Sequence, residues 1–146
     1  MSILIDTNVL LRRIQPDHPS HPVAFESVAH ILSGDQLGCY TPQVVAEFWN
    51  AATRPAEKNG LGLSVAMTLH KVHEIEEMLT LLEDIAAIYD DWKRLVVQHQ
   101  VRGAKVHDTR LVAAMNVHGV RRILTFNTGD FARFPVEVIH PAALAG

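Results

Sequence analysis

The chain has 146 residues, of which 48% are hydrophobic and 20% are charged, and its formal net charge is −3. This length and apolar content predict a single folded domain over residues 1–146 and exclude a disordered chain. The lone cysteine, Cys39, excludes a disulfide framework and a cysteine-based zinc finger, and the acidic balance excludes a broad basic surface for nucleic acid.

The first half of the chain alternates short apolar runs with helical periodicity. Strands are predicted at residues 3–5 and 37–40, and a loop that contains two prolines is predicted at 17–22. Thr41 followed by Pro42 predicts a helix N-terminus, and Pro55 ends that helix. Helical spacing joins three apolar sets: Phe25, Val28, Ala29 and Leu32; then Val44, Val45, Phe48, Trp49 and Ala52; then Val65, Leu69, Val72 and Ile75.

The second half repeats this alternation. Further strands are predicted at residues 79–82, 122–126 and 136–139. A helix is predicted through Ile85, Ile88, Tyr89, Trp92, Leu95, Val96 and His99. A last long helix is predicted to begin at His107 or Asp108 and to end at Gly119. The alternation predicts an α/β fold with three layers, α/β/α, around a mostly parallel central sheet.

Four carboxylates fall where chemistry is expected in such a sheet, beyond the carboxyl ends of strands or on helices that begin there. They are Asp6, Glu47, Asp108 and Asp130. Each also has an ordinary structural interpretation. Asp6 and Asp130 can be turn residues, Asp108 can cap its helix, and Glu47 can face solvent.

The four acids together are more informative than any one of them. Two carboxylates about 4 Å apart repel by ~4 kcal/mol at an effective dielectric near 20. A cluster therefore needs protonation or a cation between its members. Because the candidate ligands are oxygens, the cation they favour is Mg²⁺ or Mn²⁺. Such an ion activates water for phosphodiester hydrolysis.

Four segments in this order are similar to the conserved motifs of a known family: Ile3–Leu10, Val44–Phe48, His107–Ala114 and Leu124–Phe131. The sequence resembles the PIN-domain family, and within it the VapC-type ribonuclease toxins of prokaryotic toxin–antitoxin pairs. The resemblance covers the chain from Ile3 to about His140.

The resemblance implies a PIN-like fold and an endoribonuclease that depends on Mg²⁺ or Mn²⁺. It implies that Asp6, Glu47 and Asp108 are catalytic metal ligands, with Asp130 as the fourth. It also implies cleavage of RNA to 5′-phosphate and 3′-hydroxyl products, a homodimer, and neutralisation by a small antitoxin protein.

Several further positions take supporting roles by the same resemblance. Thr125 resembles a hydroxyl that hydrogen-bonds the acidic cluster, and Asn8 a nearby amide. Many family members carry an acid where this chain has Asn127. The amide of Asn127 can still bind a metal-bound water or a phosphate, but it cannot neutralise the charge of a second metal ion. Arg12 and Arg110 are candidate contacts to the RNA backbone.

The N-terminus lacks the basic and apolar regions of a signal peptide, and no run approaches the ~20 apolar residues of a membrane span. We therefore expect a cytoplasmic protein. Two other functions remain open to test. One is a PIN-like module that binds RNA or protein without cleaving it. The other, a receiver-type domain with Asp6 as phosphate acceptor, lacks the paired acids and the lysine that such domains carry.

Overall fold

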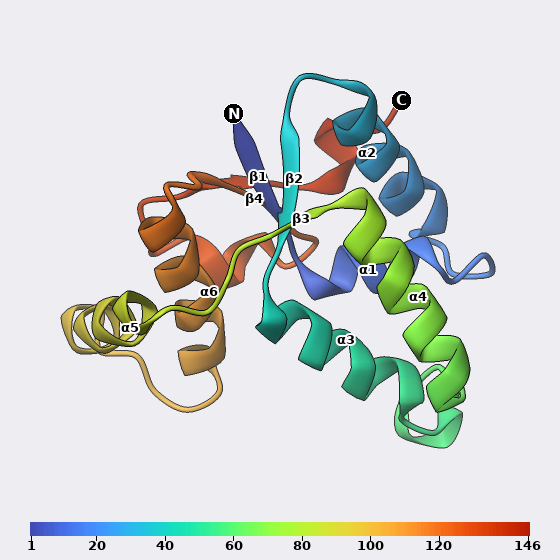
Figure 1. Cartoon of the computed structure of the whole chain (residues 1–146), viewed down its shortest axis with the longest axis horizontal. Helices are drawn as coiled ribbons and strands as arrows, with labels where there is room; N and C mark the ends of the chain where they lie inside the picture. The colour runs from blue at the N-terminus through green and yellow to red at the C-terminus, as the bar shows by residue number, and fades with distance from the viewer.

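Five parallel strands form the central sheet in the computed structural model, which describes residues 1–146, and their order is β3-β2-β1-β4-β5 (Figure 1). The strands are β1 (Ser2–Ile5), β2 (Leu37–Tyr40), β3 (Thr80–Leu81), β4 (Arg122–Leu124) and β5 (Glu137–Ile139). The predicted α/β class is confirmed, and the sheet is parallel throughout.

Helices connect the strands in pairs. They are α1 (Thr7–Arg13), α2 (His21–Ser33), α3 (Pro42–Thr53), α4 (Val65–Met78), α5 (Ala86–Gln98) and α6 (Lys105–His118), with short 3₁₀ helices η1 (Ala56–Lys58), η2 (Thr128–Phe131) and η3 (Pro141–Ala143). In Figure 1, α1 to α4 lie on one side of the sheet and α5 and α6 on the other, so the fold has three layers. No helix combines the length and apolarity needed to cross a bilayer.

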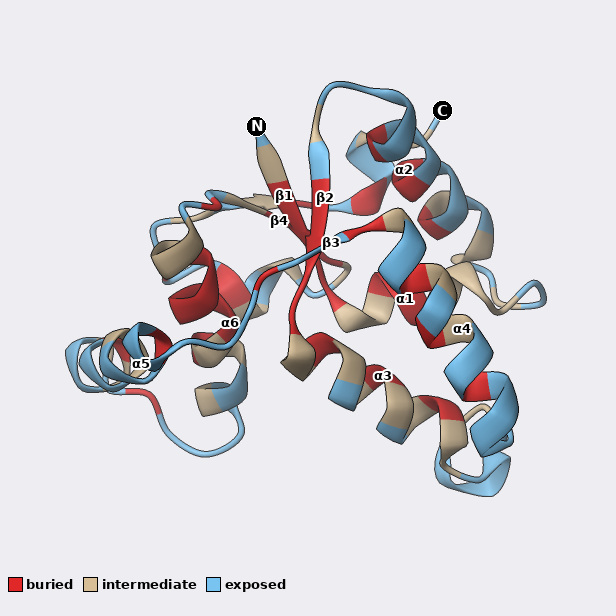
Figure 2. Ribbon diagram, in the orientation of Figure 1, coloured by how far each residue is buried: buried red, intermediate tan, exposed pale blue.

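The core is centred on β1, whose Ile3, Leu4 and Ile5 have no exposed surface (Figure 2). A strand buried on both faces must be apolar throughout, which explains the unbroken run at the N-terminus. The α3 stripe also packs inward, because Val44, Phe48 and Ala52 are buried as predicted.

The site described below depends on the register between β1 and β4. Ile5 pairs with Leu124, and the Asp6 backbone N–H donates to the Leu124 carbonyl at 3.0 Å. Chain connections leave β1 and β4 toward opposite faces of the sheet, so a crevice opens where these two strands end. Asp6 and Thr125 are the first residues beyond the two strands.

Some predicted boundaries are wrong. The helix predicted to begin at His107 or Asp108 begins at Lys105, after Gly103 turns the chain at φ +61°. No side chain caps this N-terminus, so the sequence lacks the usual helix-start signal there. The predicted strands at 79–82 and 122–126 are also shorter. The second ends at Leu124, and Thr125 keeps one backbone hydrogen bond to the sheet, from its N–H to the Ile139 carbonyl at 3.0 Å.

Two predicted apolar stripes are only partly buried. On α2, Phe25 and Leu32 are 47% and 43% exposed, while Ala24, Ser27, Val28 and Ile31 face the core. The small residues at 24 and 27 let the helix pack closely through that face. On α4, Leu69 is exposed and Thr68 takes the buried position.

Candidate functional site

Asp6 is a buried carboxylate at the end of β1 and the N-cap of α1. Its Oδ1 accepts a hydrogen bond from the Thr7 backbone N–H at 2.8 Å. Its Oδ2 accepts from the Thr125 hydroxyl at 2.8 Å and from the Asn8 amide at 3.3 Å. Oδ1 therefore accepts from the first backbone N–H of α1 and not from the N–H two residues on that an Asx turn uses, while the second oxygen faces the end of β4.

Burial raises the pKa of Asp6, and the charge of Asp130 adds to this, while hydrogen bonds from Thr125, Thr7 and Asn8 oppose it. Burial of a carboxylate is unfavourable unless its charge is compensated. No arginine or lysine forms an ion pair with Asp6. Its negative charge can therefore be compensated by a proton or by a cation from solution.

Asn8 and Thr125 fix the loop that follows β4. The Asn8 amide donates to Thr125 Oγ1 at 3.2 Å, and its carbonyl oxygen accepts from the Phe126 backbone N–H at 3.1 Å. The Asn127 backbone N–H donates to Thr125 Oγ1 at 3.0 Å. The structure thus places two of the three predicted supporting residues, Asn8 and Thr125, directly against Asp6.

Glu47 lies in the second turn of α3, half-buried, on the helix that Thr41 caps through its hydroxyl. The Thr7 hydroxyl donates long hydrogen bonds of 3.5 Å to Glu47 Oε1 and to the Val44 carbonyl. Burial raises the pKa of Glu47, and the charges of Asp6 and Asp108 raise it further. Glu47 therefore faces the cluster, and the solvent-facing alternative is wrong.

Asp108 lies in the first turn of α6 and does not cap it, so capping is excluded, while the other structural alternative, a favourable position at the positive end of the helix, agrees with this placement. Burial raises its pKa to about 6, and the charges of Asp130 and Asp6 add to the effect. The charges of Lys105 and His107 oppose it. The pKa of Asp108 is therefore raised mainly by burial and further by two of the other three candidate carboxylates.

Asp130 lies on η2, and its carboxylate forms an ion pair with the Lys105 ammonium. Asp130 differs from the other three acids in having this fixed cationic partner. Because η2 follows β4 and packs on α6, the charge of Asp130 nevertheless raises the pKa of both Asp6 and Asp108. The four predicted acids are thus brought into one electrostatic group.

The donor set fits a hard divalent cation that keeps part of its water shell. No three acidic, histidine or cysteine side chains converge tightly enough to enclose an ion by themselves. Mg²⁺ takes one or two carboxylates directly and retains several waters. The carboxylates are partly buried, three of them have raised pKa values, and one basic side chain lies beside them. This set suits an ion that keeps some of its water better than an ion enclosed entirely by protein ligands.

The weaker predicted residues lie apart from the cluster or turn away from it. The Arg12 guanidinium, near the end of α1, donates to Gln15 Oε1 at 2.7 Å, and it pairs with none of the four acids. Arg110 pairs with Asp84 at 3.2 Å instead. Asn127 contributes a backbone N–H to Thr125, and its side chain is exposed. The structure gives Arg12 no place in this site.

Three residues take part that the sequence did not single out for these roles. Thr7 links Asp6 to α3, and Lys105 pairs with Asp130. Gln43 joins α3 to α6, because its amide donates to the His107 carbonyl at 2.8 Å. Gln43 precedes Glu47 by one helical turn, and Lys105 precedes Asp108 by three positions, so each shares a helix face with a predicted acid.

Comparisons with known proteins agree with the fold. The sequence profile of the PIN domain family matches residues 3–137. No curated protein is significantly similar in sequence. Solved structures are similar in fold at low sequence identity.

Three of these structures are similar over nearly their full length. VapBC2 from Rickettsia felis, bound to a promoter DNA fragment, gives a TM-score of 0.70 at 14% identity, covering 96% of this chain and 98% of that one. Mycobacterium tuberculosis VapC20, a toxin that cleaves the sarcin–ricin loop, gives 0.69 at 16%, covering 92% and 98%. VapBC-1 from nontypeable Haemophilus influenzae gives 0.66 at 13%, covering 97% and 98%.

Proposed function

Because this chain belongs to the PIN domain family, we propose that it is an endoribonuclease dependent on Mg²⁺ or Mn²⁺ that acts as the toxin of a toxin–antitoxin pair. The observation that supports this most strongly is the group of four acids at the ends of β1 and β4. Burial and mutual repulsion raise the pKa of Asp6, Glu47 and Asp108 together. A divalent cation relieves that repulsion.

Asp6, Glu47, Asp108 and Asp130 are the residues that would hold the ion. When bound, Mg²⁺ or Mn²⁺ supplies positive charge that activates water and stabilises the charge that develops on the phosphate oxygens. Asp108, with a pKa of about 6, gives up its proton near neutral pH and becomes available as a ligand. Because Asp6 is buried, its carboxylate makes few contacts with bulk water that could compete with a bound ion.

The surrounding side chains orient this cluster. Thr125 and Asn8 both donate to Asp6 Oδ2, so that oxygen keeps one position. The Thr7 hydroxyl on α1 donates a hydrogen bond to Glu47, and the Lys105 ammonium forms an ion pair with Asp130. Fixed dipoles and charges around the reacting phosphate cost no reorganisation during the reaction, which is the main advantage of such a framework.

The partners of this protein follow from the same proposal. VapBC2 of R. felis and VapBC-1 of H. influenzae are similar in fold. Their relation supports a small antitoxin as the partner of this chain. A homodimer and a cytoplasmic location are proposed from the resemblance of the sequence to the VapC-type toxins. RNA is the proposed substrate, and the sarcin–ricin loop activity of the similar VapC20 toxin supports RNA over DNA.

Cleavage of single-stranded RNA in Mg²⁺, Mn²⁺ or EDTA tests the proposal. We expect 5′-phosphate and 3′-hydroxyl products with either metal and none in EDTA. Asp6→Asn should lower the rate by at least about 100-fold, whereas Glu26→Gln, at an exposed position of α2, should match the parent. Equal cleavage by Asp6→Asn and the parent contradicts the mechanism. RNA binding without any cleavage supports the non-catalytic module instead.

A further inference from the structure

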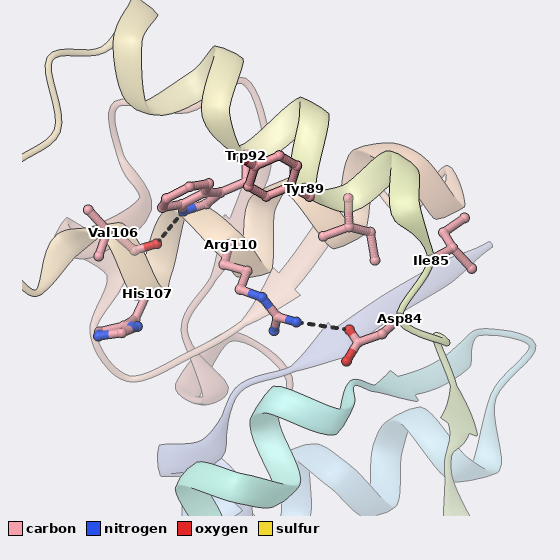
Figure 3. A pocket seen from close by; sticks show the side chains of 8 residues that line it. Asp84, Ile85, Tyr89, Trp92, Val106, His107 and Arg110 are labelled. Carbon is pink, nitrogen blue, oxygen red and sulfur yellow. Dashed lines mark hydrogen bonds and ion pairs between the residues drawn. The ribbon is translucent and has the colours of Figure 1, made fainter.

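A hollow of about 390 Å³ lies between α5 and α6, and the proposed function makes no use of it (Figure 3). Its apolar wall includes Ile88, Trp92 and Val106. His107 also lines it and is the residue directly before Asp108 on α6. The hollow therefore adjoins the carboxylate cluster along the first turn of one helix.

Two aromatic rings give the hollow a flat surface. The rings of Tyr89 and Trp92 are stacked, with centroids 6.2 Å apart and planes 30° apart. The Trp92 Nε1–H donates to the Val106 carbonyl at 2.8 Å, which fixes the indole against α6. Tyr89 is 60% exposed, and the Lys93 ammonium lies 5.1 Å from the centroid of its ring, so a base that stacks on Tyr89 must displace this ammonium or lie beside it. Bases of single-stranded nucleic acid stack on such rings.

A charged pair lies at the mouth of the hollow, below the two rings in Figure 3. Arg110 Nη2 donates to Asp84 Oδ1 at 3.2 Å, and its Nη1 donates to Gln43 Oε1 at 2.9 Å. Both charged groups remain partly exposed. The mouth therefore presents donors and an acceptor side by side, which matches the mixed donors and acceptors on the edge of a base.

A second hollow continues from this mouth toward α3. It shares Asp84, His107 and Arg110 with the first hollow and extends to Gln43 and Ala46 on α3. None of the four acids lines either hollow. Gln43 lies one helical turn before Glu47, and its amide donates to the carbonyl of His107, the residue before Asp108. The two hollows therefore run from the aromatic rings to the helical turns that carry Glu47 and Asp108, and an RNA chain in them can place a base at the rings and a phosphate near those acids.

We propose that the Tyr89–Trp92 hollow binds one unpaired RNA base close to the phosphate at which the carboxylate cluster acts, an inference that rests on the proposed function. The base stacks on Tyr89, and its edge contacts the Arg110–Asp84 pair. The charged pair favours a base over an apolar protein side chain. An apolar side chain would cover both charges without replacing their hydrogen bonds to water, which is unfavourable.

Binding of a short fluorescent RNA of mixed sequence tests this site apart from cleavage. The measurement uses the Asp6→Asn protein in Mg²⁺, so that the RNA stays intact, and follows anisotropy. Adding Tyr89→Ala should weaken binding about tenfold, as expected for the loss of one stacked base. Tyr89→Phe should bind like the Asp6→Asn parent. Val97→Ala removes another exposed apolar side chain of α5 and is the matched control.

Sequencing the products from a random RNA pool gives a second readout. We expect the native protein to favour certain bases at one position near the cut, and Tyr89→Ala to lose that preference. KM should rise about tenfold with little change in kcat. If Tyr89→Ala and Val97→Ala bind and cut alike, the base site is wrong although the nuclease function stands.

Failure of the nuclease proposal can be distinguished from failure of the base site. If the native protein cleaves no RNA but Asp6→Asn still binds RNA in a Tyr89-dependent manner, the nuclease proposal fails and the base site stands. If Tyr89→Ala weakens a complex with a partner protein and leaves RNA binding unchanged, the hollow is a protein-docking site and our inference is wrong. The absence of any RNA binding overturns both proposals.

Discussion

The Thr125 hydroxyl donates a 2.8 Å hydrogen bond to Asp6 Oδ2, and the pairing of Ile5 with Leu124 places these two residues side by side. Thr125→Val keeps the shape and removes the donor. Hydrogen bonds to charged groups contribute about 1.5–3 kcal/mol, so the charged form of Asp6 becomes less favourable. We expect RNA cleavage near pH 6 to fall by about tenfold or more, with partial recovery at higher pH. Thr125→Ser keeps the hydroxyl, and its pH–rate profile should match that of the parent.

The metal-free protein should lose stability as pH rises from about 4 to about 6. The Asp108 pKa is 3.8 in its reference state and about 6 in the folded protein, so over this range the folded state holds more protons than the unfolded chain. The raised pKa values of Asp6 and Glu47 act in the same direction. Urea unfolding in EDTA at several pH values measures the slope.

Asp108→Asn should flatten this slope and stabilise the metal-free protein at pH 7.5, because a neutral amide carries no charge into the cluster. The same substitution should abolish cleavage. Stability and activity therefore change in opposite directions, which a merely unfolded variant cannot produce. A slope identical to that of the parent would show that Asp108 does not titrate between those pH values.

Divalent ions should stabilise the parent against heat. A ligand at 100 times its Kd adds ~2.7 kcal/mol to the free energy of unfolding, which raises Tm by several degrees in a domain of this size. Mn²⁺ should produce this rise in the parent and not in Asp6→Asn. Glu26→Gln, which changes an acid on the outer surface of α2, should respond like the parent. Absence of any Mn²⁺ effect on the parent would count against a metal site.

Lys105→Met should tighten Mn²⁺ binding. The Lys105 ammonium pairs with Asp130 and lowers the pKa of Asp108, so it competes with a cation for the same charges. The interaction energy of two unit charges 4 Å apart is about 1 kcal/mol even in water, which corresponds to roughly a fivefold change in Kd. Calorimetric titration measures it. Lys58→Met, on η1, is the control and should leave the affinity unchanged.

Local signals in the sequence were sufficient to locate the five strands approximately, and to place the end of β1, the start of α3 and the end of α6. The apolar run before Asp6, the Thr41–Pro42 cap and Gly119 each act through neighbouring atoms, and each element begins or ends where they predict. The start of α6 could not be predicted in this way, because it depends on a turn at Gly103 with no capping side chain.

The candidate site was predictable as a set of residue types but not as a set of contacts. Asp6 follows a strand in the sequence, and its position next to Thr125 follows from strand order, which no short pattern encodes. Thr7 and Lys105 have roles only because α3 and η2 pack beside them. Arg12 is close to Asp6 in sequence, yet it lies at the other end of α1.

The pairing of β1 with β4 has a consequence for the protein during synthesis. Asp6 and Thr125 are separated by 119 positions, and β4 inserts beside β1 only after both have left the ribosome. Contacts between such distant positions form late, since a long loop must close first. A nascent chain therefore carries Asp6 without the neighbours that orient it until at least 119 further residues have been synthesised, and the carboxylate cluster cannot assemble before that point.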